Sequence, residues 1–158
     1  AEANAETWAF FEEALEMGLA RSIGVSNFLP RHLDQLLETA KIVPMVNQIK
    51  LSPGVTQPEV VDYCRGQGIL LESYSPLDVG RLLHVPEIKR LAAKYGRTEA
   101  QVVLRWHIQQ GFLALPKASS LKRIEENITI FDFELTEEDM GLLSGLTKHA
   151  KQPRGPIV

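Results

Sequence analysis

Apolar residues recur along the chain with the spacing of helices, and short apolar runs separate these stretches. In the first stretch, 7–17, the inward positions are Trp8, Phe11 and Leu15, and Gly18 follows as a left-handed cap. The same reasoning predicts helices at 30–40, 59–65, 86–94 and 98–110, one that begins after Ser120, and a last short one from Thr136 to about Leu143. The apolar runs between them predict strands at 20–26, 45–49, 69–73 and 112–115.

Each predicted strand is followed by at least one helix before the next strand begins. Such an order requires crossover connections and therefore a parallel sheet, because a hairpin cannot join strands through a helix. The pattern predicts an α/β fold of four βα units. The length of 158 residues, with 44% apolar side chains, suits one domain over 1–158 with a substantial core.

Polar residues collect at the carboxyl ends of the predicted strands. These are Ser26, Asn27, Gln48, Tyr74, Ser75 and Lys117. In a (βα)8 barrel the functional site lies at this rim, so the collection favours a site there. In the alternative interpretation they are ordinary solvent-exposed loop residues, and the predicted fold alone does not decide between the two.

The stretch from Leu115 to Asn127 holds a second signal. Lys117 and Arg123 lie around a strand-to-helix junction, where the helix start offers unpaired N–H groups and a partial positive charge. A phosphate dianion is the ligand that such a junction favours. In the alternative interpretation Ser119 or Ser120 is only an N-cap and the charged residues form a solvated helix face.

Charge and cysteine content exclude several classes of protein. The net charge is −3, with 17 basic and 20 acidic residues mixed along the chain, which indicates neither a nucleic-acid surface nor a membrane patch. Cys64 is the single cysteine, so no disulfide can form within the chain, and we expect a cytoplasmic protein. The four histidines lack metal-ligand spacing, so we expect no metal.

Five motifs, taken together and in order, resemble the aldo/keto reductase superfamily. They are Ile23 to Phe28, Val46 to Gln48, Glu72 to Leu77, Leu115 to Lys117 with Arg123 to Asn127, and Phe131 to Leu135. The part resembled is the second half of the family's TIM-type barrel, strands five to eight. A whole barrel takes about 250 residues, so the resemblance implies a half-barrel.

The resemblance implies a nicotinamide site on the first strands. By matching position, Ser26, Asn27 and Gln48 would bind the carboxamide, whose C=O and NH2 need paired donors and acceptors. Tyr74 would stack on the ring and fix which face stays open for hydride transfer.

The family's pyrophosphate cover corresponds to the segment that begins with Ser75 and Leu77. Two positions depart from the family pattern. Asp78 stands where the family often has glycine, and Ala118 replaces a frequent serine. A carboxylate beside a pyrophosphate would repel it, and we expect the loop at Gly80 to carry Asp78 outward.

At the adenosine end, Lys117, Ser119 and Arg123 resemble the clamp on a 2'-phosphate, and Glu126 and Asn127 the contacts to the adenine amino edge. Two cations bind a 2'-phosphate dianion more strongly than they bind an uncharged 2'-hydroxyl. The resemblance therefore predicts NADP(H) rather than NAD(H), in an enzyme that reduces aldehydes or ketones.

The family's catalytic aspartate, tyrosine, lysine and histidine belong to the first half of the barrel. Tyr63, Tyr74 and Tyr95 have no lysine and histidine in family-like positions, so we assign no catalytic residue. Three functions stay open: the cofactor-binding half of a reductase, an NADP(H)-binding module without turnover, and an interaction domain. Because a half-barrel exposes strand edges and apolar surface, we expect self-association, a separate N-terminal half, or a longer parent enzyme.

Overall fold

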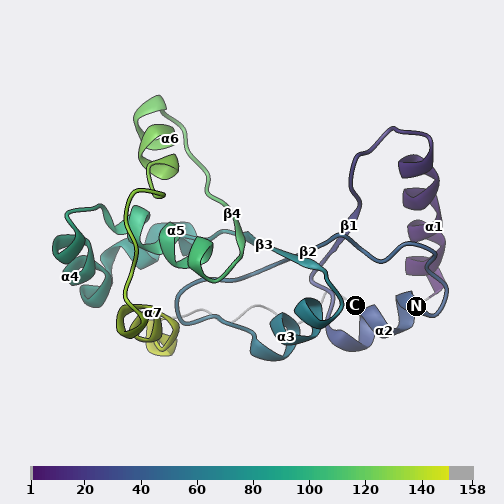
Figure 1. Cartoon of the computed structure of the whole chain (residues 1–158), viewed down its shortest axis with the longest axis horizontal. Coiled ribbons are helices and arrows are strands. Elements are labelled where there is room, and N and C mark those ends of the chain that lie inside the picture. Colours follow the sequence, from purple (N-terminus) through teal and green to yellow (C-terminus); the bar gives the residue numbers. More distant parts are fainter. Residues whose placement is uncertain (1, 150–158) are drawn as a thin grey trace. The chain divides into compact units, whose positions relative to one another are not determined.

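The computed structural model describes residues 2–149 of the chain. These residues form two compact units. The first contains the described residues up to Ile49 and Gln57–Leu71, and the second Lys50–Thr56 and the described residues from Glu72 onward. Figure 1 labels the helices and strands. Their bounds are α1 Glu2–Glu16, β1 Gly24–Ser26, α2 Pro30–Leu37, β2 Val46–Ile49, α3 Pro58–Gly66, β3 Leu70–Tyr74, α4 Pro86–Tyr95, α5 Glu99–Gln109, β4 Leu113–Leu115, α6 Leu121–Ile128 and α7 Glu137–Ser144, with short 3-10 segments at Asp78–His84 and Thr147–His149.

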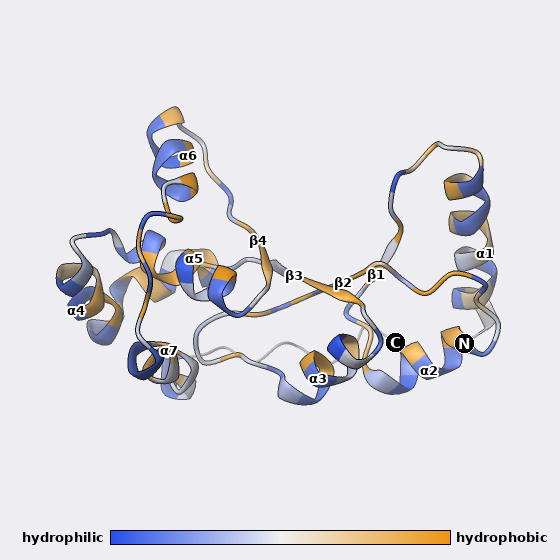
Figure 2. Cartoon of the chain, in the orientation of Figure 1, coloured by the Kyte–Doolittle hydropathy of each residue, from blue (hydrophilic) through white to orange (hydrophobic). Residues whose placement is uncertain are grey.

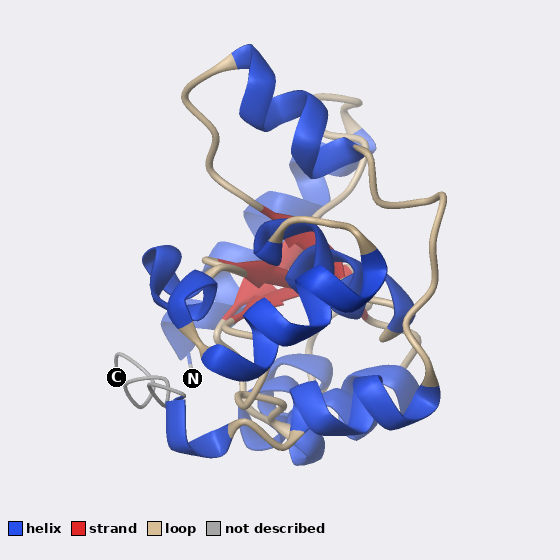
Figure 3. Ribbon diagram, turned by 90° about the vertical axis from the view of Figure 1, so that its left-hand side faces the viewer, coloured by secondary structure: helices blue, strands red, loops and turns tan. Residues whose placement is uncertain are grey.

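The strands form one four-stranded sheet in the order β1-β2-β3-β4. Figure 3 shows the strands in red and the helices in blue. The β1–β2 and β3–β4 pairs are both parallel. In register, Ser26 lies opposite Gln48 and Tyr74 lies opposite Leu115. The predicted α/β fold with a parallel sheet is therefore confirmed, and the register pairs the polar residues Ser26 and Gln48 near the carboxyl ends of β1 and β2.

The first unit is organised around Trp8. Its indole packs in a buried cluster with Ile23 and Leu36, and its Nε1–H donates to the carbonyl of Ile42 at 3.0 Å. Helix α1 begins earlier than predicted, at Glu2 rather than residue 7. Phe11, expected to face inward, is 44% exposed, so the inward prediction for this side chain is wrong.

Strand β1 is shorter than predicted and begins at Gly24 rather than residue 20. A Cβ on Gly24 would lie 2.5 Å from the carbonyl oxygen of Val46 in β2, closer than real side chains come. Glycine is therefore required where the two strands approach each other. Just before the paired residues of β1 and β2, the Met45 N–H donates a hydrogen bond to the Ile23 carbonyl.

The core of the second unit is built on α5. Every residue from Ala100 to His107 is buried, and Trp106 lies edge-on to the ring of Phe112 at 6.0 Å. Figure 2 shows that the helices carry both hydrophilic and hydrophobic residues, whereas the strands are mostly hydrophobic. The predicted caps are present, since the Thr98 hydroxyl accepts from Gln101 N–H and Gly96 and Gly111 have positive φ.

The described helices include none with the length and apolar character needed to cross a bilayer.

Candidate functional site

Ser26, Asn27 and Gln48 come together where β1 and β2 end. The carbonyl of Gln48 accepts from the Ser26 hydroxyl at 3.1 Å and from the Asn27 backbone N–H at 2.9 Å. The Asn27 side-chain amide donates to Ser26 Oγ at 3.1 Å. The three residues that the family resemblance assigned to a carboxamide are therefore neighbours with fixed geometry.

Asn47 supports this arrangement from inside and was not singled out from the sequence. It is fully buried, its Nδ2 donates to the Phe28 carbonyl at 2.8 Å, and its Oδ1 accepts from Phe28 N–H at 3.4 Å. Asn27, one residue earlier, has φ +57, a left-handed conformation that needs support from its surroundings. A second polar residue beside Gln48 in this short strand was the available signal for this role.

The end of β3 carries Tyr74, Ser75 and Leu77 in one tight turn. Tyr74 and Leu77 are half-buried, whereas Ser75 is exposed and left-handed, with φ +51. The Asp78 N–H donates to the Ser75 carbonyl at 2.8 Å and closes the turn. These residues share one short segment of the second unit, as expected.

Asp78 does not point outward, so that expectation is wrong. Its side chain is buried, and Oδ1 accepts from Lys50 Nζ at 3.0 Å and from Arg81 Nη2 at 2.8 Å. Burial alone would raise the pKa of this carboxyl, but the hydrogen bonds from Arg81 and Lys50 hold it below its ordinary value. The ionised carboxylate is stabilised inside the protein by two cations.

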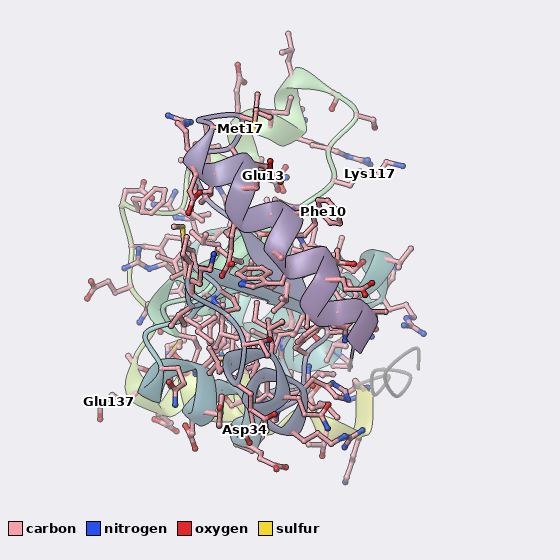
Figure 4. The ribbon with its side chains drawn as sticks, turned by 90° about the vertical axis from the view of Figure 1, so that its right-hand side faces the viewer. Phe10, Glu13, Met17, Asp34, Lys117 and Glu137 are labelled. Carbon is pink, nitrogen blue, oxygen red and sulfur yellow. The ribbon has the colours of Figure 1, made fainter. Side chains whose placement is uncertain are left out.

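The junction between β4 and α6 presents Lys117, Ser119 and Arg123 on the surface. All three are exposed, and Figure 4 shows Lys117 extending away from its loop. Ser120 is the N-cap, because its Oγ accepts from Arg123 N–H at 3.4 Å, which leaves the Ser119 hydroxyl uncommitted to capping. Within residues 2–149, the side chains of Lys117 and Arg123 have no ion-pair or hydrogen-bond partner.

Glu126 and Asn127 follow on α6 and are half-buried. One oxygen of Glu126, Oε1, accepts from the hydroxyl of Thr98 at 2.7 Å. Glu126 therefore joins α6 to the start of α5 as well as standing at the predicted adenine-edge position. This structural contact was not foreseen.

Polar side chains of α5 hold the chain at the end of α6 and just after it. Gln101 Nε2 donates to the carbonyls of Glu126 and Thr129, at 3.1 and 2.9 Å, and Arg105 Nη1 donates to the carbonyl of Ile130 at 3.1 Å. These bonds satisfy carbonyls near the end of α6 and just after it. The orientation of α6 therefore depends on side chains of α5 rather than on apolar burial, since none of its residues is buried.

The tyrosines other than Tyr74 are bound to carboxylates. Tyr63 donates a short hydrogen bond to Asp34, and Tyr95 one to Asp139. The Asp34 bond, followed by burial, raises the pKa of Tyr63 to about 12. A tyrosine whose pKa is raised is a weaker acid, which is opposite to what a general acid toward a carbonyl oxygen needs.

Across residues 2–149, His, Cys, Asp and Glu side chains form no group of three or more that could hold a metal ion.

Comparison with known proteins places these features in a family. The model of the aldo/keto reductase family matches residues 2–148. The chain is 46% identical over 151 residues to the glyoxal reductase of Bacillus subtilis, covering 96% of this chain and 55% of that protein. It is 37% identical over 156 residues to the aldo-keto reductase family 1 member A1-A of Danio rerio, covering 92% and 48%.

Solved structures agree with the sequence comparison. A mutant of Gox0644 in complex with NADPH superimposes with a TM-score of 0.85 at 40% identity, covering 89% of this chain and 52% of that one. The aldose reductase of Schistosoma japonicum superimposes with a TM-score of 0.87 at 35% identity, covering 93% and 48%. The chain spans about half the length of the relatives it matches. By its sequence and its fold, the chain belongs to the aldo/keto reductase family.

Proposed function

We propose that this chain is the cofactor-binding, carboxyl-terminal half of an NADPH-dependent aldo/keto reductase that converts aldehydes or ketones to alcohols. The observation that carries the proposal is that two exposed cations, Lys117 in the loop before α6 and Arg123 in its first turn, have no partner among residues 2–149. Exposed cations without a protein partner favour an anionic ligand, and a helix N-terminus beside them adds to that preference. The NADPH complexes of solved relatives supply the identity of that ligand.

The residues present fit such a cofactor at both of its ends. Ser26, Asn27 and Gln48 offer hydroxyl and amide groups that can pair with a carboxamide. The clamp, which we define as Lys117, Ser119 and Arg123, offers two charges and a hydroxyl to a 2'-phosphate, with Glu126 and Asn127 next to it for the adenine. Tyr74 supplies an aromatic face for the nicotinamide ring.

When bound, the reduced nicotinamide supplies the hydride for carbonyl reduction. The role of this chain is to hold and orient that ring and to select the phosphorylated cofactor. Stacking by Tyr74 would leave one ring face open, which is a positioning contribution to rate.

A second candidate is an NADP(H)-binding module without turnover of its own. It is favoured by the tyrosines, because Tyr63 and Tyr95 each donate to a carboxylate and neither is poised as a proton donor. Mixing the chain with NADPH and an aldehyde, and following the absorbance of the reduced cofactor, separates the candidates. We expect no turnover from this chain alone and turnover once an N-terminal half is supplied.

The clamp is tested by comparing NADPH with NADH in calorimetric titrations. Lys117→Met and Arg123→Ala should each weaken NADPH by about tenfold or more and NADH little, because only NADPH carries the 2'-phosphate. Lys122→Met, which removes an exposed cation from the same helix, is the matched control and should change neither. Equal losses for both cofactors in the clamp variants would remove the 2'-phosphate role.

We also propose that an N-terminal half of the barrel covers apolar surface on this chain. Leu121, Ile124 and Ile128 recur at helical spacing along α6 and are 77%, 46% and 63% exposed (Figure 2). Phe10 on α1 and Met17 directly after it are 70% and 65% exposed and lie along one side with Glu13 (Figure 4). The occupant we favour is a segment that corresponds to the rest of the relatives' length, since this chain spans about half of it.

Sedimentation of the chain with and without a separately produced N-terminal half tests this partnership. A complex of one copy of each supports it. Dimers of this chain that persist when the other half is added would instead assign these faces to self-association. A cytoplasmic location is part of the proposal and can be checked by fractionation of the native host.

A further inference from the structure

The turn after β3 is unusual in both backbone and charge. Asp78, Val79 and Gly80 have consecutive positive φ values of +47, +56 and +85. Val79 is β-branched, so a positive φ is unfavourable for it. Its side chain is 88% exposed, so burial of this side chain does not offset the cost. Such strain persists only where surrounding contacts impose it, and it concentrates at ligand-binding segments.

The contacts that impose it are those of the Asp78 carboxylate. Lys50 and Arg81 both donate to Oδ1, while Oδ2 is buried and has no hydrogen-bond partner within residues 2–149. Asp78 is 3% exposed and Lys50 is 8% exposed, so their pair lies inside the protein. Breaking one partner of a buried pair is costly, which makes this pair a strong anchor for the turn.

Arg81 differs from Lys50 in exposure. Its side chain is 53% exposed, and its Nε also donates to the backbone carbonyl of Asp78 at 3.4 Å. Bonds through Nε and Nη2 fix the plane of the guanidinium against the turn and leave Nη1 uncommitted to any described residue. An aligned guanidinium with free donors matches the geometry of phosphate oxygens.

The charge of the cluster follows from its members. Lys50 and Arg81 carry two positive charges and Asp78 one negative charge, so the net charge is +1 despite the carboxylate. The carboxylate of Asp78 is paired with two cations, so the repulsion expected from Asp78 alone is offset.

We propose that Arg81, aligned by the buried carboxylate of Asp78, binds the pyrophosphate of the cofactor, and that Lys50 cancels the charge of that carboxylate. The inference rests on the proposed NADP(H) site and adds to it a residue that the family resemblance did not supply. Arg81 is the binding residue, and Asp78 and Lys50 are positioning residues.

Three ligands separate the pyrophosphate role from the 2'-phosphate role. NADPH carries both groups, NADH carries only the pyrophosphate, and 2'-AMP carries only the 2'-phosphate. Titrated into the chain, Arg81→Met should weaken NADPH and NADH by about tenfold each and leave 2'-AMP unchanged. Arg123→Ala should give the complementary pattern, with losses for NADPH and 2'-AMP only.

Arg90→Met is the matched control, because it removes an exposed arginine of α4 and makes the same change in net charge. It should leave all three affinities unchanged. Unaltered NADPH and NADH affinities in Arg81→Met would overturn the inference, and so would equal losses for 2'-AMP and the dinucleotides.

Asp78→Asn distinguishes alignment from simple charge. The variant adds one net positive charge but replaces the charge-assisted bond that aligns Arg81 with a weaker one to an amide oxygen. The inference therefore predicts weaker binding of NADPH and NADH, whereas a repelling carboxylate predicts tighter binding. Circular dichroism checks folding, and the double variant Lys50→Met with Asp78→Asn avoids a buried uncompensated lysine and should show the same weakening. Tighter dinucleotide binding by folded protein would overturn the inference.

Failure of the inference and failure of the proposed function give different results. If the unaltered chain is folded and binds none of the three ligands, the cofactor site itself is wrong and the inference falls with it. If the unaltered chain binds all three and only the Arg81 variant is unchanged, the site stands and Arg81 has no part in it.

Discussion

The side-chain amide of Gln109 and the backbone of Leu135 are joined by two hydrogen bonds. Gln109 Nε2 donates to the Leu135 carbonyl at 3.0 Å, and Leu135 N–H donates to Gln109 Oε1 at 2.7 Å. A side chain of α5 thus satisfies both backbone groups of a residue in the loop before α7. Gln109 therefore joins Gln101 and Arg105 among the polar side chains of α5 that fix the path of the chain after α6.

Replacing Gln109 should therefore destabilise the protein more than the loss of one ordinary hydrogen bond. Gln109→Ala leaves the N–H and C=O of Leu135 without their partner, and we expect the free energy of unfolding to fall by about 1–3 kcal/mol. Urea denaturation measures it. Gln35→Ala, at an exposed glutamine of α2, should cost much less, and equal losses in the two variants would show that the paired bonds contribute little.

In the first unit, Glu12 has a comparable role. It is 6% exposed, and its Oε1 accepts from the N–H groups of Lys41 and Ile42, each at 2.8 Å. Glu12→Ala removes both acceptor contacts, so we expect a loss of about 1–3 kcal/mol in urea denaturation. The adjacent and exposed Glu13 in Figure 4 is the matched control, and Glu13→Ala should change stability little. A Glu12 variant as stable as the Glu13 variant would contradict the assigned role.

Gly24→Ala tests the close approach of β1 and β2. The added methyl would meet the Val46 carbonyl at 2.5 Å, so the strands must separate or the ladder must break. We expect a loss of about 1–3 kcal/mol of stability and, because Ser26 lies two residues further along β1, weaker NADPH binding in proportion. Gly66→Ala, where nothing lies within 4 Å of the added atom, is the control. Unchanged stability in the Gly24 variant would refute the steric account.

Stability should also depend on pH through His107. This side chain is fully buried, with Nδ1 2.8 Å from the Val103 carbonyl and Nε2 3.1 Å from that of Leu51. Burial lowers its pKa below the ordinary 6.5, and the backbone hydrogen bonds with Val103 and Leu51 oppose that shift only in part. Below about pH 6.5 the unfolded chain therefore binds a proton that the folded state does not.

The contribution of His107 is complete above pH 6.5 and is lost as the pH falls toward its lowered pKa. Urea denaturation between pH 7.5 and about 5.5 should show this decline, and His107→Gln should flatten it. His84→Gln, at an exposed histidine, should leave it in place. A decline of the same size in the His107 variant would assign the pH dependence to other groups.

Much of the fold could be predicted because local signals agree with the tertiary structure. The capping residues Thr98 and Thr136 start helices where their spacing predicts, and the left-handed Gly18 follows the first helix as expected. Strand ends were less certain. The first strand was predicted to begin at residue 20, but the ladder begins only at Gly24, and hydrogen bonding between strands is not a local property of the sequence.

The candidate site was predicted by residue type, and its supports were not. Ser26, Asn27 and Gln48 lie together as expected. Asn47, which is buried and holds Phe28 behind them, was identified only as part of the motif from Val46 to Gln48 and was given no role. Asp78 was misjudged because its partner Lys50 lies 28 residues away in sequence. Long-range polar pairs of this kind follow from the packing of elements, which spacing along the chain does not reveal.

The central claim is that the residues after β1 and β2 and the clamp after β4 bind two ends of one NADP(H) molecule. Amide chemical-shift mapping of the isotope-labelled chain during an NADPH titration tests it most directly. We expect the signals of Ser26, Asn27 and Gln48 and those of Lys117, Ser119 and Arg123 to shift together, with one common dissociation constant. Shifts confined to one group, or two groups that titrate at different NADPH concentrations, would contradict the account.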